Sequence, residues 1–152
     1  MRRLALIALC TVATAGMAAA PAGAASVKIG RSIAGIRPGM SVAEVKQRLG
    51  RPASDGRVSG SRVLAWPRRG IAVSTYRQTS DVFTITTQSR RDRTAEGIGV
   101  GSSRGELRRA YPRARCTRYA CTIGSFPRRR TSFAFSRDGR RVMQVLLLGA
   151  RR

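Results

Sequence analysis

The sequence predicts an α+β fold of two tandem repeats, each with one helix followed by about three antiparallel strands, and with both helices on one face of the sheet. Three observations predict it. Residues 35–45 align with residues 97–107 without a gap, and Gly, Ile, Gly, Ser and Glu are identical in the two segments. Each segment contains an S-x-x-E helix start. Alternating apolar residues, typical of strands, follow each helix.

Residues 1–24 have the features of a Sec-type signal peptide. Arg2 and Arg3 precede an apolar stretch that ends at Ala20, and an A-x-A cleavage motif follows at residues 22–24. The apolar stretch is at the short limit for crossing a bilayer. We therefore expect cleavage and a secreted or extracytoplasmic mature chain. Residues 25–34 are expected to form an N-terminal arm or a short edge strand.

Two capping boxes mark the helix starts. In each box the serine hydroxyl accepts a hydrogen bond from a free amide of the first turn, and the glutamate bonds back to the serine amide. The helices are expected at residues 42–49 and 104–111, and the prolines that follow stop them. Capping accounts for both glutamates, so we expect no catalytic pair. The capping residues are Ser41, Glu44, Ser103 and Glu106.

Strands are expected wherever apolar residues alternate between turn signals. The last expected strand, residues 141–148, is apolar on both faces, which predicts a central or doubly covered position. The other expected strands are residues 62–66, 70–76, 82–87 and 131–136, with a hairpin at 115–123. Repeat 1 then covers residues 35–89, a linker covers 90–96, and repeat 2 covers 97–152.

Two of the three cysteines remain after loss of the leader. Cys116 and Cys121 are spaced as in a short hairpin, and an exported protein folds in an oxidising compartment. The spacing predicts a structural disulfide that clamps the hairpin. Because the chain has no histidine, zinc sites that use histidine and His-dependent catalytic triads are excluded. We expect no metal, no cofactor and no enzymatic activity.

The run Gly39-Met40-Ser41-Val42-Ala43-Glu44-Val45-Lys46-Gln47-Arg48-Leu49-Gly50-Arg51-Pro52 resembles the opening of the SmpA/OmlA-type (BamE-like) domain. Trp66 and the strand segments after it fit the order of that family. The tandem arrangement resembles the two-repeat architecture of secreted beta-lactamase inhibitor proteins. The resemblance implies a non-catalytic binding module and carries over no contact residues.

A binding module of this kind would contact another extracytoplasmic protein through the sheet face that the helices leave free. Polar or amphipathic side chains on one strand parity, together with a tyrosine and an arginine at the hairpin tip, are the candidate contacts. They are Ser74, Tyr76, Thr84, Thr86, Arg118 and Tyr119.

The formal net charge of +23 supports an alternative. All but two of the 30 basic residues are arginine, which grips phosphate with two parallel hydrogen bonds. Arginines crowd at loop positions, and we expect several of them to share one rim of the sheet. These loops would bind anionic envelope polymers or lipids, and this binding would weaken with salt. A specific nucleic-acid target is not expected for an exported chain. The candidate anion-binding residues are Arg68, Arg69, Arg128, Arg129, Arg130, Arg140 and Arg141.

Overall fold

The computed structural model describes residues 26–125 and 127–149; the signal peptide predicted at residues 1–24 lies outside them. The N-terminal part contains β1 (Val27–Lys28), β2 (Ser32–Ile33), α1 (Val42–Leu49), β3 (Ser54–Val58), β4 (Ser61–Trp66), the 3-10 turn η1 (Pro67–Arg69), β5 (Ile71–Thr75) and β6 (Val82–Thr87). The C-terminal part contains α2 (Arg104–Ala110), β7 (Arg115–Cys116), β8 (Ala120–Ile123), β9 (Arg130–Phe135) and β10 (Val142–Leu148).

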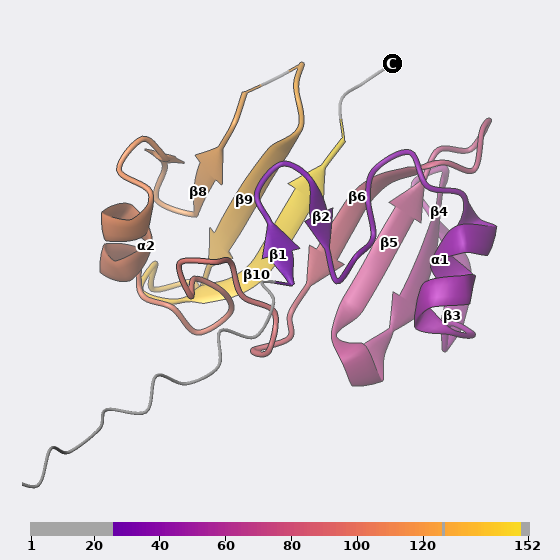
Figure 1. Cartoon of the computed structure of the whole chain (residues 1–152), viewed down its shortest axis with the longest axis horizontal. Coiled ribbons are helices and arrows are strands. Elements are labelled where there is room, and N and C mark those ends of the chain that lie inside the picture. The colour runs from indigo at the N-terminus through magenta and orange to yellow at the C-terminus, as the bar shows by residue number, and fades with distance from the viewer. Residues whose placement is uncertain (1–25, 126, 150–152) are drawn as a thin grey trace, which may run out of the picture.

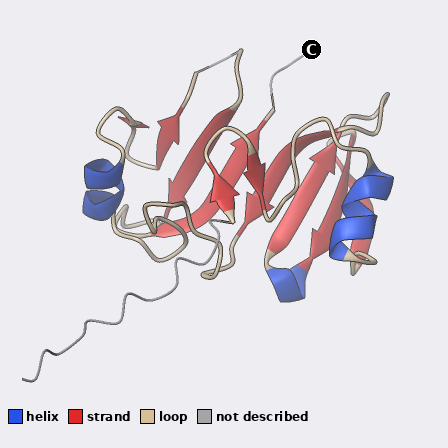
Figure 2. Ribbon diagram, viewed as in Figure 1, coloured by secondary structure: helices blue, strands red, loops and turns tan. Residues whose placement is uncertain are grey.

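An eight-stranded antiparallel sheet dominates the molecule, with the strand order β3-β4-β5-β6-β10-β9-β8-β7 (Figures 1 and 2). α1 and α2 lie toward opposite ends of this sheet (Figure 1). β1 and β2 form a separate two-stranded sheet that packs near β6 and β9, between the helices. β10 pairs with both β6 and β9, so the strand that is apolar on both faces lies in the centre of the sheet.

The prediction of two tandem helix-plus-strand repeats is wrong. The structure is one continuous sheet with only two short helices, because β6 hydrogen-bonds directly to β10 and joins the N-terminal and C-terminal strands. Half of a chain of this size is marginal for burying a core of its own. The repeat pattern also has no place for β3, which was not among the expected strands. Residues 25–34, expected as an arm or a short edge strand, contain the two-stranded β1–β2 pair.

One face of the sheet carries the core. Along the inner strands every second side chain is buried, as expected for a sheet with one covered face. Ile85 of β6 and Leu147 of β10 are partners in the central ladder and are both fully buried. Residues from α1, α2 and the β1–β2 pair complete the same cluster, including Val45, Leu107 and Ile33.

The two helices have only eight and seven residues, which is too short for stability in isolation. Tertiary packing holds them: Val45 and Leu49 of α1 are buried, and so is Leu107 of α2. α1 ends at Gly50, which has φ 81°, and the Trp66 indole donates a hydrogen bond of 3.1 Å to the Gly50 carbonyl. The end of α1 is therefore fixed to β4.

Three threonines of the central strands are completely buried, and their hydroxyls differ in bonding. Thr87 bonds to the buried Asp92 carboxylate at 2.5 Å. Thr131 accepts a 2.9 Å hydrogen bond from the Gly30 amide and so ties the β1–β2 turn to β9. The Thr75 hydroxyl has no hydrogen-bond partner among the described residues. A buried polar group without a partner destabilises the folded state.

Replacing Thr75 with valine, which has nearly the same shape, is therefore expected to raise the free energy of unfolding by about 1 kcal/mol. Thr131→Val is the matched control, because it removes a hydroxyl that does bond and leaves the Gly30 amide without an acceptor. We expect it to lower stability by about 1–2 kcal/mol. Urea unfolding of both variants measures the difference, and equal shifts in the same direction would contradict this account.

Candidate functional site

The face of the sheet opposite the helices has no covering element among the described residues. We call it the open face. Strand register places one row of its side chains across all eight strands: Ser54, Ala65, Ala72, Thr86, Leu146, Ser132, Thr122 and Arg115. Except for the residues of the two edge strands, these side chains are half-buried. They are small or neutral, and the Thr122 and Ser132 hydroxyls bond each other at 3.1 Å.

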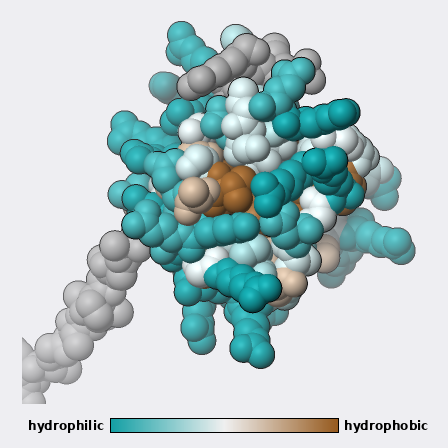
Figure 3. Space-filling view, turned by 90° about the vertical axis from the view of Figure 1, so that its right-hand side faces the viewer, coloured by the Kyte–Doolittle hydropathy of each residue, from teal (hydrophilic) through white to brown (hydrophobic). Residues whose placement is uncertain are grey.

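Charged side chains are missing from most of the open face. On β3, β4, β5, β6 and β10, which are neighbours in the sheet, the open-face positions hold Ser, Thr, Gly, Ala, Val, Leu, Met, Phe and Gln, although 24% of the chain is charged. The charged strand residues on this face, Arg130 and Arg115, lie on β9 and β7. Elsewhere hydrophilic side chains project widely, as seen at the α1 and β3 end of the molecule (Figure 3).

Two β-bulges modify the open face. The pairing of β5 with β6 skips Phe83, and the pairing of β10 with β9 skips Met143. A bulge inserts one unpaired residue and turns its side chain out of the regular alternation. Phe83 packs against Tyr76 with ring centroids 4.7 Å apart, and Met143 is 58% exposed. The bulges therefore add an aromatic pair and a flexible thioether to an otherwise flat surface.

A cavity of about 460 Å³ lies where β5 turns into β6, and Tyr76 of this aromatic pair lines it. Tyr76 and Thr79 of the turn line it, together with Pro38, Arg129 and the backbone of Gly149. It is large enough to receive a side chain of a partner. Of the predicted contact residues, Ser74, Tyr76, Thr84 and Thr86 thus share the open face, and Tyr76 also lines the cavity.

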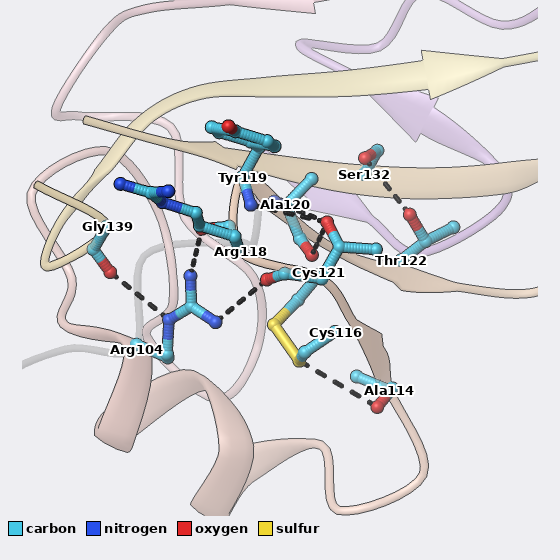
Figure 4. Close-up of a disulfide and its surroundings, with 11 residues drawn as sticks. Arg104, Ala114, Cys116, Arg118, Tyr119, Ala120, Cys121, Thr122, Ser132 and Gly139 are labelled. Carbon is cyan, nitrogen blue, oxygen red and sulfur yellow. Dashed lines mark hydrogen bonds between the residues drawn. A yellow bond between two sulfur atoms is a disulfide. The ribbon is translucent and has the colours of Figure 1, made fainter. Parts of the chain in front are cut away.

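The disulfide hairpin lies at the far end of the sheet. Cys116 of β7 and Cys121 of β8 are bonded, as predicted (Figure 4). The tip residues Arg118 and Tyr119 project into solvent, with the Tyr119 side chain 66% exposed and the Arg118 guanidinium 5.7 Å from its ring centroid. The hairpin tip is therefore separate from the cavity beside Tyr76.

Arg104 fixes this hairpin tip in place. Its guanidinium donates hydrogen bonds to the carbonyls of Gly139 at 3.1 Å, Thr117 at 2.8 Å and Arg118 at 2.5 Å (Figure 4). It also lies 4.3 Å above the centre of the Phe135 ring. The charge of Arg104 is thus used to join the β7–β8 turn to the β9–β10 turn, and its donors are turned away from any external anion.

The arginine-rich loops do not all share one rim. Strand register places η1, with Arg68 and Arg69, at the same end of the strands as Arg140 and Arg141. Arg130, which pairs with the end of β10, places Arg128 and Arg129 at the opposite end. Arg141 also donates to the Gly101 carbonyl at 2.9 Å. Two of the three arginine clusters therefore lie at the same end of the strands, and the third lies at the opposite end.

The four capping residues form reciprocal hydrogen bonds at the helix starts. The Ser41 amide donates to Glu44 at 2.7 Å, and the Ser103 amide donates to Glu106 at 2.6 Å. These backbone hydrogen bonds are the main reason why the pKa of each glutamate lies below its usual value. Both carboxylates therefore cap the N-terminal ends of the helices.

The described residues contain no group of three or more Cys, Asp or Glu side chains placed to hold a metal ion. Within the same residues, no helix has the length and apolar character needed to cross a membrane.

Comparisons with known proteins place the fold. No protein-family model matches the sequence, and no curated protein does. One solved structure with a similar fold is an extracellular protein containing a SCP domain from Bacillus anthracis str. Ames, with a TM-score of 0.59 and 7% identity. Another is a cysteine-rich secretory protein from Staphylococcus aureus subsp. aureus Mu50, with a TM-score of 0.51 and 9% identity. Both similarities cover 74% of this chain and 44% of the other, so this chain spans less than half the length of either protein.

These comparisons overturn the resemblance to the SmpA/OmlA-type domain and to beta-lactamase inhibitor proteins. The similar folds belong to extracellular SCP-type and cysteine-rich secretory proteins instead. The misleading run, residues 39–52, encodes a capping box, a buried stripe and a helix stop. Any short helix that enters a sheet in this way can use the same residues, so the run reports local structure and not family.

Sequence reasoning missed Phe83, Met143 and Arg104 as features of the site. Phe83 and Met143 begin apolar strands and look like ordinary members of the alternation, because a bulge has no reliable sequence signal. Arg104 directly follows a capping serine, and that position in the sequence predicts no contact with the hairpin. Its three acceptors come from distant turns, and only the folded chain brings them together.

Arg104→Ala is expected to lower the free energy of unfolding by about 1–3 kcal/mol, since three carbonyls lose a charged donor. It should also speed hydrogen exchange at the Ala120 amide in the hairpin. Arg108→Ala is the matched control: Arg108 is exposed on the same helix and should change stability by no more than about 0.5 kcal/mol. Similar effects of the two variants in urea unfolding and hydrogen exchange would refute the anchoring role.

Proposed function

We propose that the chain is an exported, non-catalytic binding module that contacts another protein through the open face of its sheet. The observation that carries the proposal is the distribution of charge. The chain has 30 basic residues, yet the open-face positions of five neighbouring strands carry no charged side chain. These strands are β3, β4, β5, β6 and β10. The cores of protein interfaces are depleted in charge in the same way.

The shape of the open face supports the same function. Its side chains are short and set by a rigid ladder, so little conformational entropy is lost when they are covered. Tyr76 and Phe83 form an aromatic pair, and Tyr76 lines a cavity of about 460 Å³. Binding energy in protein interfaces concentrates at such aromatic and pocket positions. We infer that this corner receives the anchor residue of the partner.

Three features support export. Residues 1–24 have the pattern of a cleavable signal peptide. The two similar solved structures are described as an extracellular protein and a secretory protein. The Cys116–Cys121 disulfide fits an oxidising compartment. The partner is therefore expected outside the cytoplasm.

Binding of anionic polymers or lipids is the competing function, and the structure gives it less support. The basic loops lie at both ends of the strands, and Arg104 and Arg141 use their donors on backbone carbonyls. Nonspecific attraction of a strongly basic chain to anions nevertheless follows from its charge. The experiment must therefore separate charge from the open face.

Thr86→Arg places a charge at the centre of the open face, and Gln47→Arg places the same charge on the exposed side of α1. The wild-type protein and both variants, immobilised, would be used to capture proteins from the envelope and medium of the producing organism. The column would be washed in about 0.5 M NaCl, where screening removes most surface attraction.

One protein retained by the wild type and by Gln47→Arg, and reduced at least about tenfold by Thr86→Arg, is the expected result, because a buried unpaired charge costs several kcal/mol. Circular dichroism would verify that both variants fold. Release of all bound material below about 0.3 M NaCl, or equal retention by both variants, would contradict the proposal and favour polyanion binding.

A further inference from the structure

The two edges of the eight-stranded sheet differ in how they are protected. The β7 edge has two residues and is held by the disulfide to β8. The β3 edge has five residues, pairs regularly with β4, and is exposed along its whole length. No described element pairs with its outer side. A regular exposed edge of this kind is a template for pairing with another strand.

The sequence of β3 is self-complementary. It reads Ser54-Asp55-Gly56-Arg57-Val58, with opposite charges placed symmetrically about a central glycine. In an antiparallel pair of two such strands related by a twofold axis at Gly56, Asp55 of each strand lies opposite Arg57 of the other. We propose that two copies of this chain pair through β3 in this register and form one continuous sheet, with a cross-strand ion pair on each side of the axis.

Contacts within one chain already hold the charged side chains of β3 in positions that suit this register. Asp55 and Arg57 point to the same side of the sheet, since they are two residues apart on one strand. Arg62 donates to both oxygens of Asp55 at 2.7 Å, and Lys46 lies 3.4 Å from the same carboxylate. These contacts hold the carboxylate in place and lower the pKa of Asp55 to about 2, so it is ionised at neutral pH.

Arg57, in contrast, lacks a carboxylate partner among the described residues. Its direct neighbour across the ladder is Arg62, a like charge, and such neighbours destabilise a strand pair. A second copy would place an ionised Asp55 opposite Arg57. Because a carboxylate offers about four lone-pair sites, it can accept from this arginine in addition to its own Arg62.

The opposite side of β3 suits the same pairing. Ser54, Gly56 and Val58 point to the open face, and Val58 is 62% exposed. In the proposed register Val58 lies beside Ser54 of the second copy. The uncharged open-face positions of one copy would therefore continue into those of the other. The two open faces would then form one surface. This dimer does not depend on the proposed function, because the edge and the open face are different surfaces.

Net charge opposes the pairing, since both copies are strongly basic. The screening length is about 10 Å at 0.1 M ionic strength and about 30 Å at 0.01 M. We therefore expect self-association to strengthen as salt rises from about 0.01 M to about 0.2 M. Binding of a polyanion would show the opposite trend, so the salt dependence distinguishes the two.

Charge reversal provides the first test, with sedimentation equilibrium of the full exported protein as the measurement. Arg57→Asp makes both positions acidic, and Asp55→Arg makes both basic. Each variant alone should dimerise at least about tenfold more weakly than the wild type, because like charges then face each other. An equimolar mixture should recover a one-to-one dimer, since every facing pair is again of opposite charge. A monomeric wild type at about 1 mM, or no recovery on mixing, overturns the proposal.

Cysteine cross-linking tests the register with substitutions that leave the charges in place. A Cβ added at Gly56 meets no atom within 4 Å, so Gly56→Cys is accommodated by the fold. On the twofold axis its thiol faces its own copy and should oxidise to a covalent dimer. Val58→Cys is the control, because its two copies would lie about 13 Å apart along the strands. Equal cross-linking of the two variants overturns this register, and circular dichroism verifies that each variant folds.

Discussion

Pairing between β6 and β10 is the interaction on which the rest of the structure depends. Four residue pairs connect these strands, and they place Ile85 beside Leu147 at the centre of the core. Each half of the folded chain, at about 60 residues, is marginal in size for a core of its own. Once the strands pair, both helices and the β1–β2 pair share one buried face, and two helices too short to be stable alone become part of it.

When only one face of a sheet is covered, the side chains of the other face determine the polarity and charge of that surface. In an antiparallel sheet that surface is usually polar and often charged, because water covers it. Here it is largely neutral, while most of the arginines lie on the helices, turns and edge strands. The arrangement leaves a flat, largely uncharged area that can be covered without burying a charge.

Several of the arginines bind groups within the protein and have a structural role. Arg104 binds three backbone carbonyls, and Arg62 binds the Asp55 carboxylate through two hydrogen bonds. The planar guanidinium suits both tasks, since its five donors can satisfy several acceptors at once. A count of arginines therefore overstates the number of guanidinium donors available to an external anion. What remains free is distributed around the sheet and not gathered into one site.

The amino-acid sequence by itself determined the local structure. Capping serines and glutamates set the start of both helices, alternation located the inner strands, and cysteine spacing indicated the disulfide. These signals arise from residues close together in the chain. Sheet order, the β-bulges at Phe83 and Met143, the place of β3 at an edge and the anchoring of Arg104 were decided only in the tertiary structure. Each depends on contacts between segments that are distant in the sequence. The local repetition in the sequence predicted two units, but the pairing of β6 with β10 produces one sheet.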